Sequence, residues 1–217
     1  HYGYVVVNTF PHDANAFTEG LVYDGGFLYE STGLLGNSTL RRVDLSTGTV
    51  LKEIVLPEQY FGEGIAVVNG TIVQLTWQSH VGFVYDRNSF ALLRNFNYPT
   101  EGWGLTYNGK NLIMSDGSDT LFFIDPLNFQ RIGQIHVHDG NSSIFDINEL
   151  EFVNGEVYAN IWHQQKIIVI NPETGAVRAW IDLNGLRSST ASSGEDVLNG
   201  IAFDKESGRI FVTGKDW

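Results

Sequence analysis

A pattern of paired apolar strands recurs five times along this chain of 217 residues, and it restricts the fold more than any other feature. Each copy opens on a polar or aromatic residue and continues with an apolar strand, a tight turn and a second apolar strand. The copies begin at Glu19, Glu63, Trp103, Asn148 and Asn199. Their turns contain Asn-Gly, Gly-Gly or Ser-Gly pairs, which suit short hairpin loops. The chain is therefore built from repeats.

A second hairpin follows each of the first four copies and enlarges the repeat to four strands. These hairpins begin at Leu40, Phe83, Leu121 and Ile167. The copies open 40 to 51 residues apart, which is the size of a propeller blade. Apolar residues alternate with a period near two, whereas a helical solenoid needs a period of about 3.6. We therefore predict an all-β fold, a five-bladed β-propeller that forms a single domain over residues 1–217.

The two ends of the chain bear on how such a ring closes. The segment from Tyr2 to Phe10 has the pattern of a strand without a partner hairpin, and the fifth copy ends at Trp217 after its second strand. Because a propeller must close its ring, we expect the N-terminal strand to complete the last blade. Two alternatives stay open: truncation after Trp217 removes a third strand, or the N-terminal strand pairs directly with the second strand and leaves a three-stranded blade. The serine-rich stretch 188–196 is predicted to be a loop.

Composition limits the partners of the chain. The net charge of −12 and the isoelectric point near 4.7 argue against binding to nucleic acid. No run of 18 apolar residues is present, so no membrane span is predicted, and the absence of cysteine excludes disulfides and a thiol nucleophile. Asn37, Asn69 and Asn141 begin Asn-X-Ser/Thr sequons, which fit a secreted glycoprotein, or a periplasmic protein in a bacterium. We expect a monomer, from which any leader peptide before His1 has been left out.

Equivalent positions of the repeat are expected to form rings at one rim of the central channel, because the first strand of every blade lines that channel. The first ring contains the opening residues Glu19, Glu63, Trp103, Asn148 and Asn199. The second ring, at the end of the second strand, contains Gly33, Trp77, Gly117, Trp162 and Lys215, and Phe17 and Phe61 lie two residues before the two carboxylates. An aromatic wall with a few directed polar groups is typical of a small-molecule site.

Simpler explanations exist for several single residues. A Glu or Asn at the start of a strand often satisfies backbone donors in a turn, and Trp180 is predicted to be a core residue. His136 and His138 share a strand face, which would suit a metal ion, but they fall on the outermost strand, so a solvated face is the favoured interpretation. His80 and His163 follow second-ring residues and receive no predicted role. No P-loop, Ser/His/Asp arrangement or zinc signature is present, and no metal ligands are predicted.

Six stretches that contain the predicted rim carry a family resemblance. They read PHDANAFTEGL, FGEGI, QLTWQ, EGWGL, INELEFVNGEVYANIWHQ and DVLNGIAFDKESGRIFVTGKDW. The chain resembles the plant and bacterial glutaminyl-peptide cyclotransferases of the papaya latex type from near residue 10 to its end. The resemblance implies a five-bladed propeller, unrelated to the zinc-dependent animal enzymes. It also implies conversion of N-terminal glutamine in peptides or proteins to pyroglutamate, with release of ammonia.

The resemblance assigns roles to the predicted rim, position by position. Glu63 matches the catalytic carboxylate of the family, and we expect it to accept the proton of the substrate amine and pass it to departing ammonia. Lys215 or Asn148 is expected to polarise the amide oxygen. The pocket residues of the family match Phe17, Phe61, Trp77, Trp103, Asn148, Trp162 and Lys215, and we add Glu19 and Asn199 as substrate-binding residues. Glu19 stands where the family pattern has glutamine, and two neighbouring carboxylates raise each other's pKa.

Two other functions remain open from the sequence. A metal-dependent hydrolase of the propeller lactonase kind would use Glu19, Glu63, Asn148 and Asn199 as hard oxygen ligands for calcium, although such enzymes generally have six blades. A non-catalytic propeller would capture a peptide end at the same mouth. The cyclotransferase chemistry requires no cofactor, and a structural calcium ion in the channel is compatible with all three functions.

Overall fold

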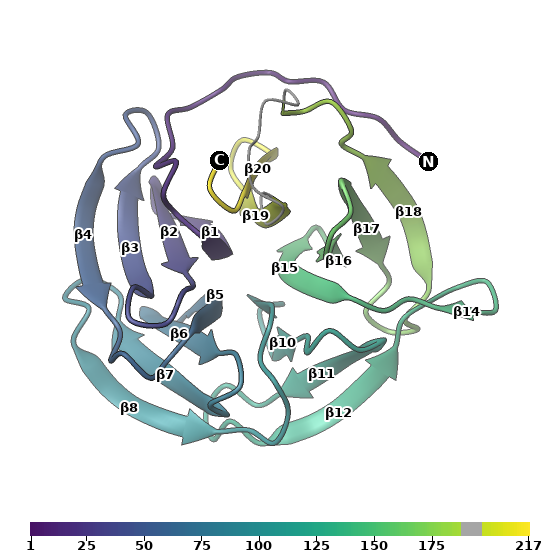
Figure 1. The fold of residues 1–217 in the computed structure, drawn as a ribbon. Helices are drawn as coiled ribbons and strands as arrows, with labels where there is room; N and C mark the ends of the chain where they lie inside the picture. Colours follow the sequence, from purple (N-terminus) through teal and green to yellow (C-terminus); the bar gives the residue numbers. More distant parts are fainter. Residues whose placement is uncertain (188–196) are drawn as a thin grey trace.

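Four antiparallel sheets of four strands surround a central axis, and a two-stranded hairpin lies between the last of these sheets and the first (Figure 1). The computed structural model describes residues 1–187 and 197–217, so the predicted loop 188–196 lies outside the described residues. The described part of the chain contains strands and turns but no helix. The predicted all-β, propeller-like fold is confirmed.

Strand order within each sheet follows chain order, with the first strand innermost. The first sheet contains β1 (Thr18–Asp24), β2 (Phe27–Thr32), β3 (Thr39–Asp44) and β4 (Val50–Val55). The second contains β5 (Gly62–Val68), β6 (Thr71–Thr76), β7 (Val81–Asp86) and β8 (Leu92–Asn97). The third contains β9 (Leu105–Tyr107), β10 (Leu112–Met114), β11 (Thr120–Ile124) and β12 (Arg131–His136). The fourth contains β15 (Ile147–Val153), β16 (Glu156–Ile161), β17 (Lys166–Ile170) and β18 (Val177–Asp182).

Two shorter hairpins complete the described structure. β19 (Leu198–Asp204) pairs with β20 (Arg209–Gly214), and β13 (His138–Asp139) pairs with β14 (Ser142–Ser143) between the third and fourth sheets. The inner strands contact one another in the cyclic order β1, β5, β9, β15, β19 and back to β1. The first strand of every repeat therefore lines the centre.

The N-terminal segment does not form the strand that we predicted for the last sheet. Tyr2 makes one parallel bridge to Ile181 on β18, in which Tyr2 N donates to Trp180 O at 2.8 Å and Asp182 N donates to Tyr2 O at 2.9 Å. From there the chain runs outside β19 and β20 towards β1 (Figure 1). The segment thus contacts the outer edge of β18 through a single bridge and forms no strand there. Among the described residues, β20 has no strand partner besides β19.

Apolar clusters fill the spaces between neighbouring sheets. One lies between the first and second sheets, a second between the second and third, a third between the third and fourth, and a fourth between the fourth sheet and the β19–β20 hairpin. Trp180, predicted to be a core residue, is partly buried against the third of these clusters. Because apolar clusters fill these spaces between neighbouring sheets, the ring needs no single central core.

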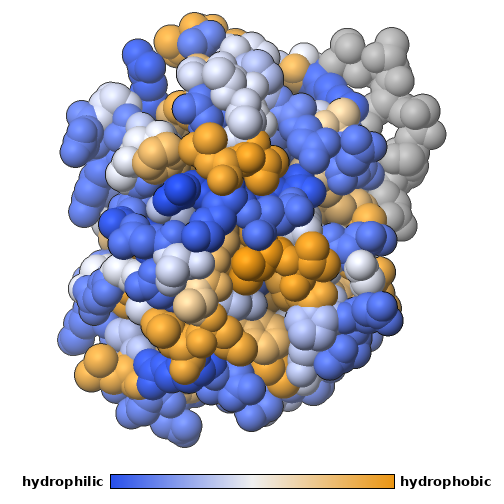
Figure 2. Space-filling model, turned by 90° about the vertical axis from the view of Figure 1, so that its left-hand side faces the viewer, coloured by the Kyte–Doolittle hydropathy of each residue, from blue (hydrophilic) through white to orange (hydrophobic). Residues whose placement is uncertain are grey.

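The outer strands face water and are protected against edge pairing. On β4, exposed residues alternate with partly buried ones, and the Val55 side chain at the end of the strand is 60% exposed. The charged residues Lys52 and Glu53 lie within the same strand. Figure 2 shows that apolar patches on the side of the molecule that carries β4 are separated by hydrophilic residues. Charges on an edge strand discourage pairing with another chain.

Glycines let the inner strands approach closely at the centre. A Cβ added at Gly20 would lie 2.7 Å from Ile65 N, and one added at Gly104 would lie 2.1 Å from Asn148 O. The fourth repeat has Glu149 at the equivalent position, and its carboxylate crosses to two other sheets. It accepts hydrogen bonds from Leu21 N at 3.2 Å and Ile201 N at 2.8 Å. The glycine after most opening residues is thus required by backbone packing.

Candidate active site

β-Bulges at the start of the inner strands direct the opening residues to one mouth of the channel, which we call the near mouth. Strand register shifts between Thr18 and Gly20, Gly62 and Ile65, Ile147 and Leu150, and Leu198 and Ile201. Four opening residues, Glu19, Glu63, Asn148 and Asn199, fall within these irregular steps. A bulge bends the strand and re-aims its side chains, and bulges are common beside active sites.

A cavity of about 330 Å³ opens at the near mouth. It is lined by Phe17, Glu19, Leu34, Phe61, Glu63, Trp77, Trp103, Asn148, Trp162, His163, Val197 and Lys215. Nine of the ten predicted site residues belong to this set. The exception is Asn199, which is fully buried behind Glu19 and donates from Nδ2 to Thr18 O at 2.9 Å and to Glu19 Oε2 at 3.0 Å.

Glu19 forms a buried ion pair with Lys215. The Lys215 Nζ lies 2.6 Å from Glu19 Oε1, and the two side chains are 8% and 2% exposed. The same ammonium lies 4.5 Å from the centre of the Phe17 ring. The backbone of Lys215 is fixed by a 2.9 Å hydrogen bond from its N to Val197 O. The Glu19 carboxylate is therefore hydrogen-bonded to both Lys215 and Asn199.

Glu63 lies in a strongly perturbed electrostatic environment at the near mouth. It is 5% exposed, and within residues 1–187 and 197–217 its carboxyl group has no hydrogen-bond partner. Burial raises the pKa of Glu63 well above its usual value, the negative charges of Glu19 and Glu101 raise it further, and Lys215 opposes them in part. A carboxyl group with a raised pKa in a pocket is suited to accept and release a proton near neutral pH.

Asn148 presents unused hydrogen-bonding capacity beside Glu63. Its backbone oxygen accepts a hydrogen bond from Ser115 Oγ at 2.7 Å, which fixes the main chain of this bulge. Its side-chain Oδ1 is buried and has no partner in the described part of the chain. A buried polar atom without a partner costs free energy, so the Asn148 side chain is a candidate for contact with a bound ligand.

Aromatic rings form two sides of the cavity. Phe61 lies 6.2 Å from Phe17 and 5.7 Å from Trp77, and Trp103 lies 5.6 Å from Trp162, all in edge-to-face arrangements. Trp77 and Trp162 remain 37% and 40% exposed, which is high for indoles and leaves apolar surface at the mouth.

Two glycines of the second ring make room for these rings. A Cβ at Gly33 would lie 2.3 Å from Phe61 Cε1, and one at Gly117 would lie 2.7 Å from Trp103 Cζ2. The second ring therefore combines two glycines, which leave space for the rings of Phe61 and Trp103, with the large side chains of Trp77 and Trp162.

Glu101 is absent from the predicted set, yet it connects two of the indoles. Its Oε2 accepts hydrogen bonds from Trp77 Nε1 at 2.7 Å and Trp103 Nε1 at 2.9 Å, and its Oε1 accepts one from Gln78 Nε2 at 2.9 Å. Burial acts to raise the pKa of Glu101, but the hydrogen bonds from Trp103, Gln78 and Trp77 outweigh it and lower the pKa. The available signal in the sequence is a carboxylate two residues before Trp103 in EGWGL.

A family model of glutamine cyclotransferases matches residues 1–217. The chain belongs to this family. It is 42% identical over 217 residues to the glutaminyl-peptide cyclotransferase of Arabidopsis thaliana, a match that covers 98% of this chain and 68% of the relative. The fold superimposes on the crystal structure of Myxococcus xanthus glutaminyl cyclase with a TM-score of 0.93 and 38% identity, over 98% of this chain and 92% of that one. A protein of unknown function from Bacteroides caccae shares the fold alone, with a TM-score of 0.53 and 14% identity over 84% of this chain and 63% of that one.

The structure brings together every residue that the family resemblance matched to a pocket position. In the alternative calcium site, Glu19 would be one of the oxygen ligands. In the structure its carboxylate instead accepts hydrogen bonds from Lys215 Nζ and Asn199 Nδ2. In the described ranges, no group of three or more His, Asp or Glu residues is arranged to hold a metal ion.

The remaining candidates lie away from the reactive groups. His136 is on β12 with its ring 63% exposed, and His138 is on β13 with Nδ1 2.9 Å from Gly140 O, so the two do not form a pair on one strand. His163 lines the cavity and packs against Trp162 at 4.2 Å, and His80 Nδ1 lies 2.6 Å from Thr100 O. Among the described residues, no helix is long and apolar enough to span a membrane.

Proposed function

We propose that this chain catalyses the cyclisation of N-terminal glutamine in peptides and proteins to pyroglutamate, with release of ammonia. Membership of the glutamine cyclotransferase family supports this reaction. The observation that carries the proposed chemistry is Glu63, a buried carboxyl group that makes no hydrogen bond among the described residues and lines an aromatic cavity together with Lys215 and Asn148.

In this proposal the substrate side chain enters the cavity with its amide directed at Lys215 and Asn148. The indoles and the phenylalanines hold the glutamine curled, so that the α-amine approaches its own side-chain carbon, and they exclude water that would hydrolyse the amide. Because Glu19 is the counter-ion of Lys215, it keeps the ammonium group inside the cavity. Lys215 Nζ and Asn148 Nδ2 then donate hydrogen bonds that stabilise negative charge on the amide oxygen during attack.

Glu63 would move protons between the two nitrogens. Free α-amines have a pKa of roughly 7.7–8.0, so much of the substrate arrives as the ammonium ion. Glu63 takes one proton from it and frees the amine to attack. It then donates that proton to the departing nitrogen, which leaves as ammonia, and takes another proton from the new ring nitrogen. This second proton passes to the released ammonia, so the Glu63 carboxylate is restored and the ammonia leaves as ammonium. Such acid–base catalysis typically contributes about 10²–10⁴ in rate.

Ammonia release from a short peptide with N-terminal glutamine tests this function, with the loss of one ammonia confirmed by mass. The parent chain is compared with Glu63→Gln and with Glu173→Gln, an exposed control of the same chemistry. We expect full activity in the control and a loss of about 10²–10⁴ in Glu63→Gln. No ammonia from the folded parent chain refutes the reaction, and full activity of Glu63→Gln refutes the role of Glu63.

We also propose that the chain is one domain whose ring contains five blades, with β19 and β20 as the inner strands of the fifth. The closed order of contacts among the inner strands supports this number. Chains extended beyond Trp217 provide a test by amide hydrogen exchange. Increased protection of β20 on extension is expected if further strands pair with it, and unchanged protection contradicts a completed fifth blade.

Further proposals concern the setting of the enzyme. Asn37, Asn69 and Asn141 are exposed, which supports a secreted glycoprotein, and a mobility change after glycosidase treatment of protein from eukaryotic cells tests it. We propose a monomer that needs no cofactor. Light scattering measures the mass, and unchanged turnover and Tm in a chelator are expected, whereas a fall in Tm alone indicates a structural calcium ion.

A further inference from the structure

A second, larger cavity lies at the opposite mouth of the channel, which we call the far mouth. It measures about 760 Å³ and is formed by β5 and by the turns of four inner hairpins, β1–β2, β9–β10, β15–β16 and β19–β20. Glu19 and Asp24 lie at opposite ends of β1, about 17 Å apart for an extended strand. The far mouth is therefore separate from the candidate active site.

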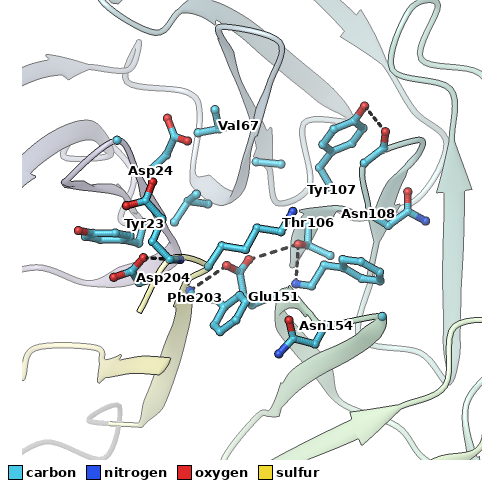
Figure 3. Close-up of a pocket in the computed structure, with 18 of the residues that line it drawn as sticks. Tyr23, Asp24, Val67, Thr106, Tyr107, Asn108, Glu151, Asn154, Phe203 and Asp204 are labelled. Atoms are coloured by element: carbon cyan, nitrogen blue, oxygen red, sulfur yellow. Dashed lines mark hydrogen bonds between the residues drawn. The ribbon is translucent and has the colours of Figure 1, made fainter. Parts of the chain in front are cut away.

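Glu151 forms the floor of this cavity. Its Oε1 accepts a 2.9 Å hydrogen bond from Phe203 N, and its Oε2 accepts one of 3.3 Å from Thr106 Oγ1. Figure 3 shows this carboxyl group between Phe203 and Thr106, near the middle of the labelled side chains. Glu151 is only 8% exposed, and the proposed cyclisation gives it no role.

The remaining lining combines negative charge with aromatic surface. Asp24, Asp204 and Glu206 contribute carboxylates, against the single ammonium group of Lys205. Four aromatic residues, Tyr23, Tyr107, Phe152 and Phe203, border the cavity, and Tyr107 and Phe152 also pack against the apolar clusters between the sheets. Asp24 is paired with Arg87 and Asp204 is bonded to Ser207, but in the described part of the chain the carboxyl group of Glu206 has no partner.

We propose that the far mouth binds a small organic ammonium ion, with Glu151 and Glu206 as its anionic contacts and the aromatic rings around its apolar part. A cation is attracted both to carboxylates and to the faces of aromatic rings. The volume is within the range of small-ligand sites, and turn glycines border open space, since a Cβ at Gly109 or Gly155 would meet no atom within 4 Å.

Proton release from Glu151 gives this binding a pH signature. Burial raises the pKa of Glu151 to about 8, although the hydrogen bonds from Phe203 and Thr106 lower it in part. The carboxyl group is therefore mostly protonated at pH 7 in the empty cavity, and a bound cation favours its ionised form. The other titratable groups that face the cavity or Glu151 are Glu149, Asp24, Asp204, Glu206, Lys205, Tyr23 and Tyr107. Affinity for a cation should rise as pH increases from about 6 towards 9.

Calorimetry with choline and its neutral isostere 3,3-dimethylbutan-1-ol tests the proposal, because choline keeps its charge at every pH. We expect choline to bind the parent chain about tenfold more tightly than the alcohol, with affinity rising with pH. Glu151→Gln and Glu206→Gln should each weaken choline about fivefold or more. Glu206 lies on an exposed turn, so its variant keeps the test valid if Glu151→Gln does not fold, and Glu173→Gln is the matched control.

Tryptophan emission locates the bound cation. The far mouth contains no tryptophan, whereas Trp77, Trp103 and Trp162 line the near mouth. We therefore expect choline to bind without changing the emission. Three outcomes would overturn the proposal: no binding of choline, equal binding of the neutral alcohol, or binding that changes the emission and is unaffected by Glu206→Gln. None of these outcomes bears on ammonia release, so the proposed cyclisation is judged separately.

Discussion

Replacing Glu19 by glutamine tests the electrostatics of the near mouth. Glu19 Oε1 accepts a 2.6 Å hydrogen bond from Lys215 Nζ, and both side chains are almost completely buried. Removing one partner of a buried ion pair typically costs about 3–5 kcal/mol. Because the new amide keeps a carbonyl acceptor for Lys215, we expect the lower end of this range, about 3 kcal/mol. For a chain of this size that corresponds to a fall in Tm of about 6–12 °C.

Glu53→Gln is the matched control for this substitution. Glu53 forms a 2.8 Å ion pair with Arg41 but is 38% exposed, and Arg41 also retains Asp13. Exposed pairs contribute less than about 1 kcal/mol, so its Tm should fall by less than about 4 °C. Thermal unfolding followed by circular dichroism at pH 7 measures both. Equal losses in the two variants would refute the reasoning about the buried pair.

The same substitution should change the titration of Glu63. After burial, the charge of Glu19 is the largest cause of the raised pKa of Glu63. Without that charge, the limb of the kcat/KM profile that reports Glu63 should move to lower pH. A limb that stays in place contradicts the coupling between the two carboxyl groups.

Three further predictions follow from contacts that flank the site. Glu101→Gln removes the negative charge that accepts hydrogen bonds from the indole N–H groups of Trp77 and Trp103. We therefore expect KM to rise about fivefold to tenfold with a smaller change in kcat, together with altered tryptophan emission. Unchanged KM and unchanged emission would contradict this role of Glu101. Gly33→Ala places a Cβ 2.3 Å from the Phe61 ring, which should cost about 1–3 kcal/mol in thermal unfolding and reduce kcat/KM, whereas parent-like values refute the packing argument. The pKa of Glu151 is raised in the folded state to about 8, so its contribution to stability is present at low pH and is lost as pH rises from about 4.5 to 8. Glu151→Gln should therefore show a smaller fall in Tm between those pH values than the parent chain, and an equal fall in both contradicts the assignment.

The repeat in the sequence was sufficient to predict which residues meet at the near mouth. Glu19, Glu63, Trp103 and Asn148 occupy the same repeat position, and a cyclic arrangement of equivalent strands brings equivalent positions together. The inward direction of these side chains follows from the period of two along each strand. Equivalent positions of neighbouring repeats therefore identify the mouth without knowledge of any long-range contact.

Contacts between unlike positions could not be predicted in this way. Lys215 and Glu19 are 196 residues apart, and their ion pair depends on how β20 and β1 face each other. Glu101 precedes its strand, and its bonds to Trp77 and Trp103 depend on the orientation of two indoles from different sheets. In the described part of the chain the N-terminal segment bridges β18, and no local pattern encodes which strand it contacts.

The rate of ammonia release at saturating peptide, measured for Glu63→Gln alongside direct binding of the same peptide, tests the central claim most directly. If Glu63 transfers the protons, the variant should bind the peptide with a Kd within about threefold of the parent, while its turnover falls by about 10²–10⁴. Turnover close to that of the parent, with binding intact, would contradict the claim that Glu63 is the acid–base group of this site.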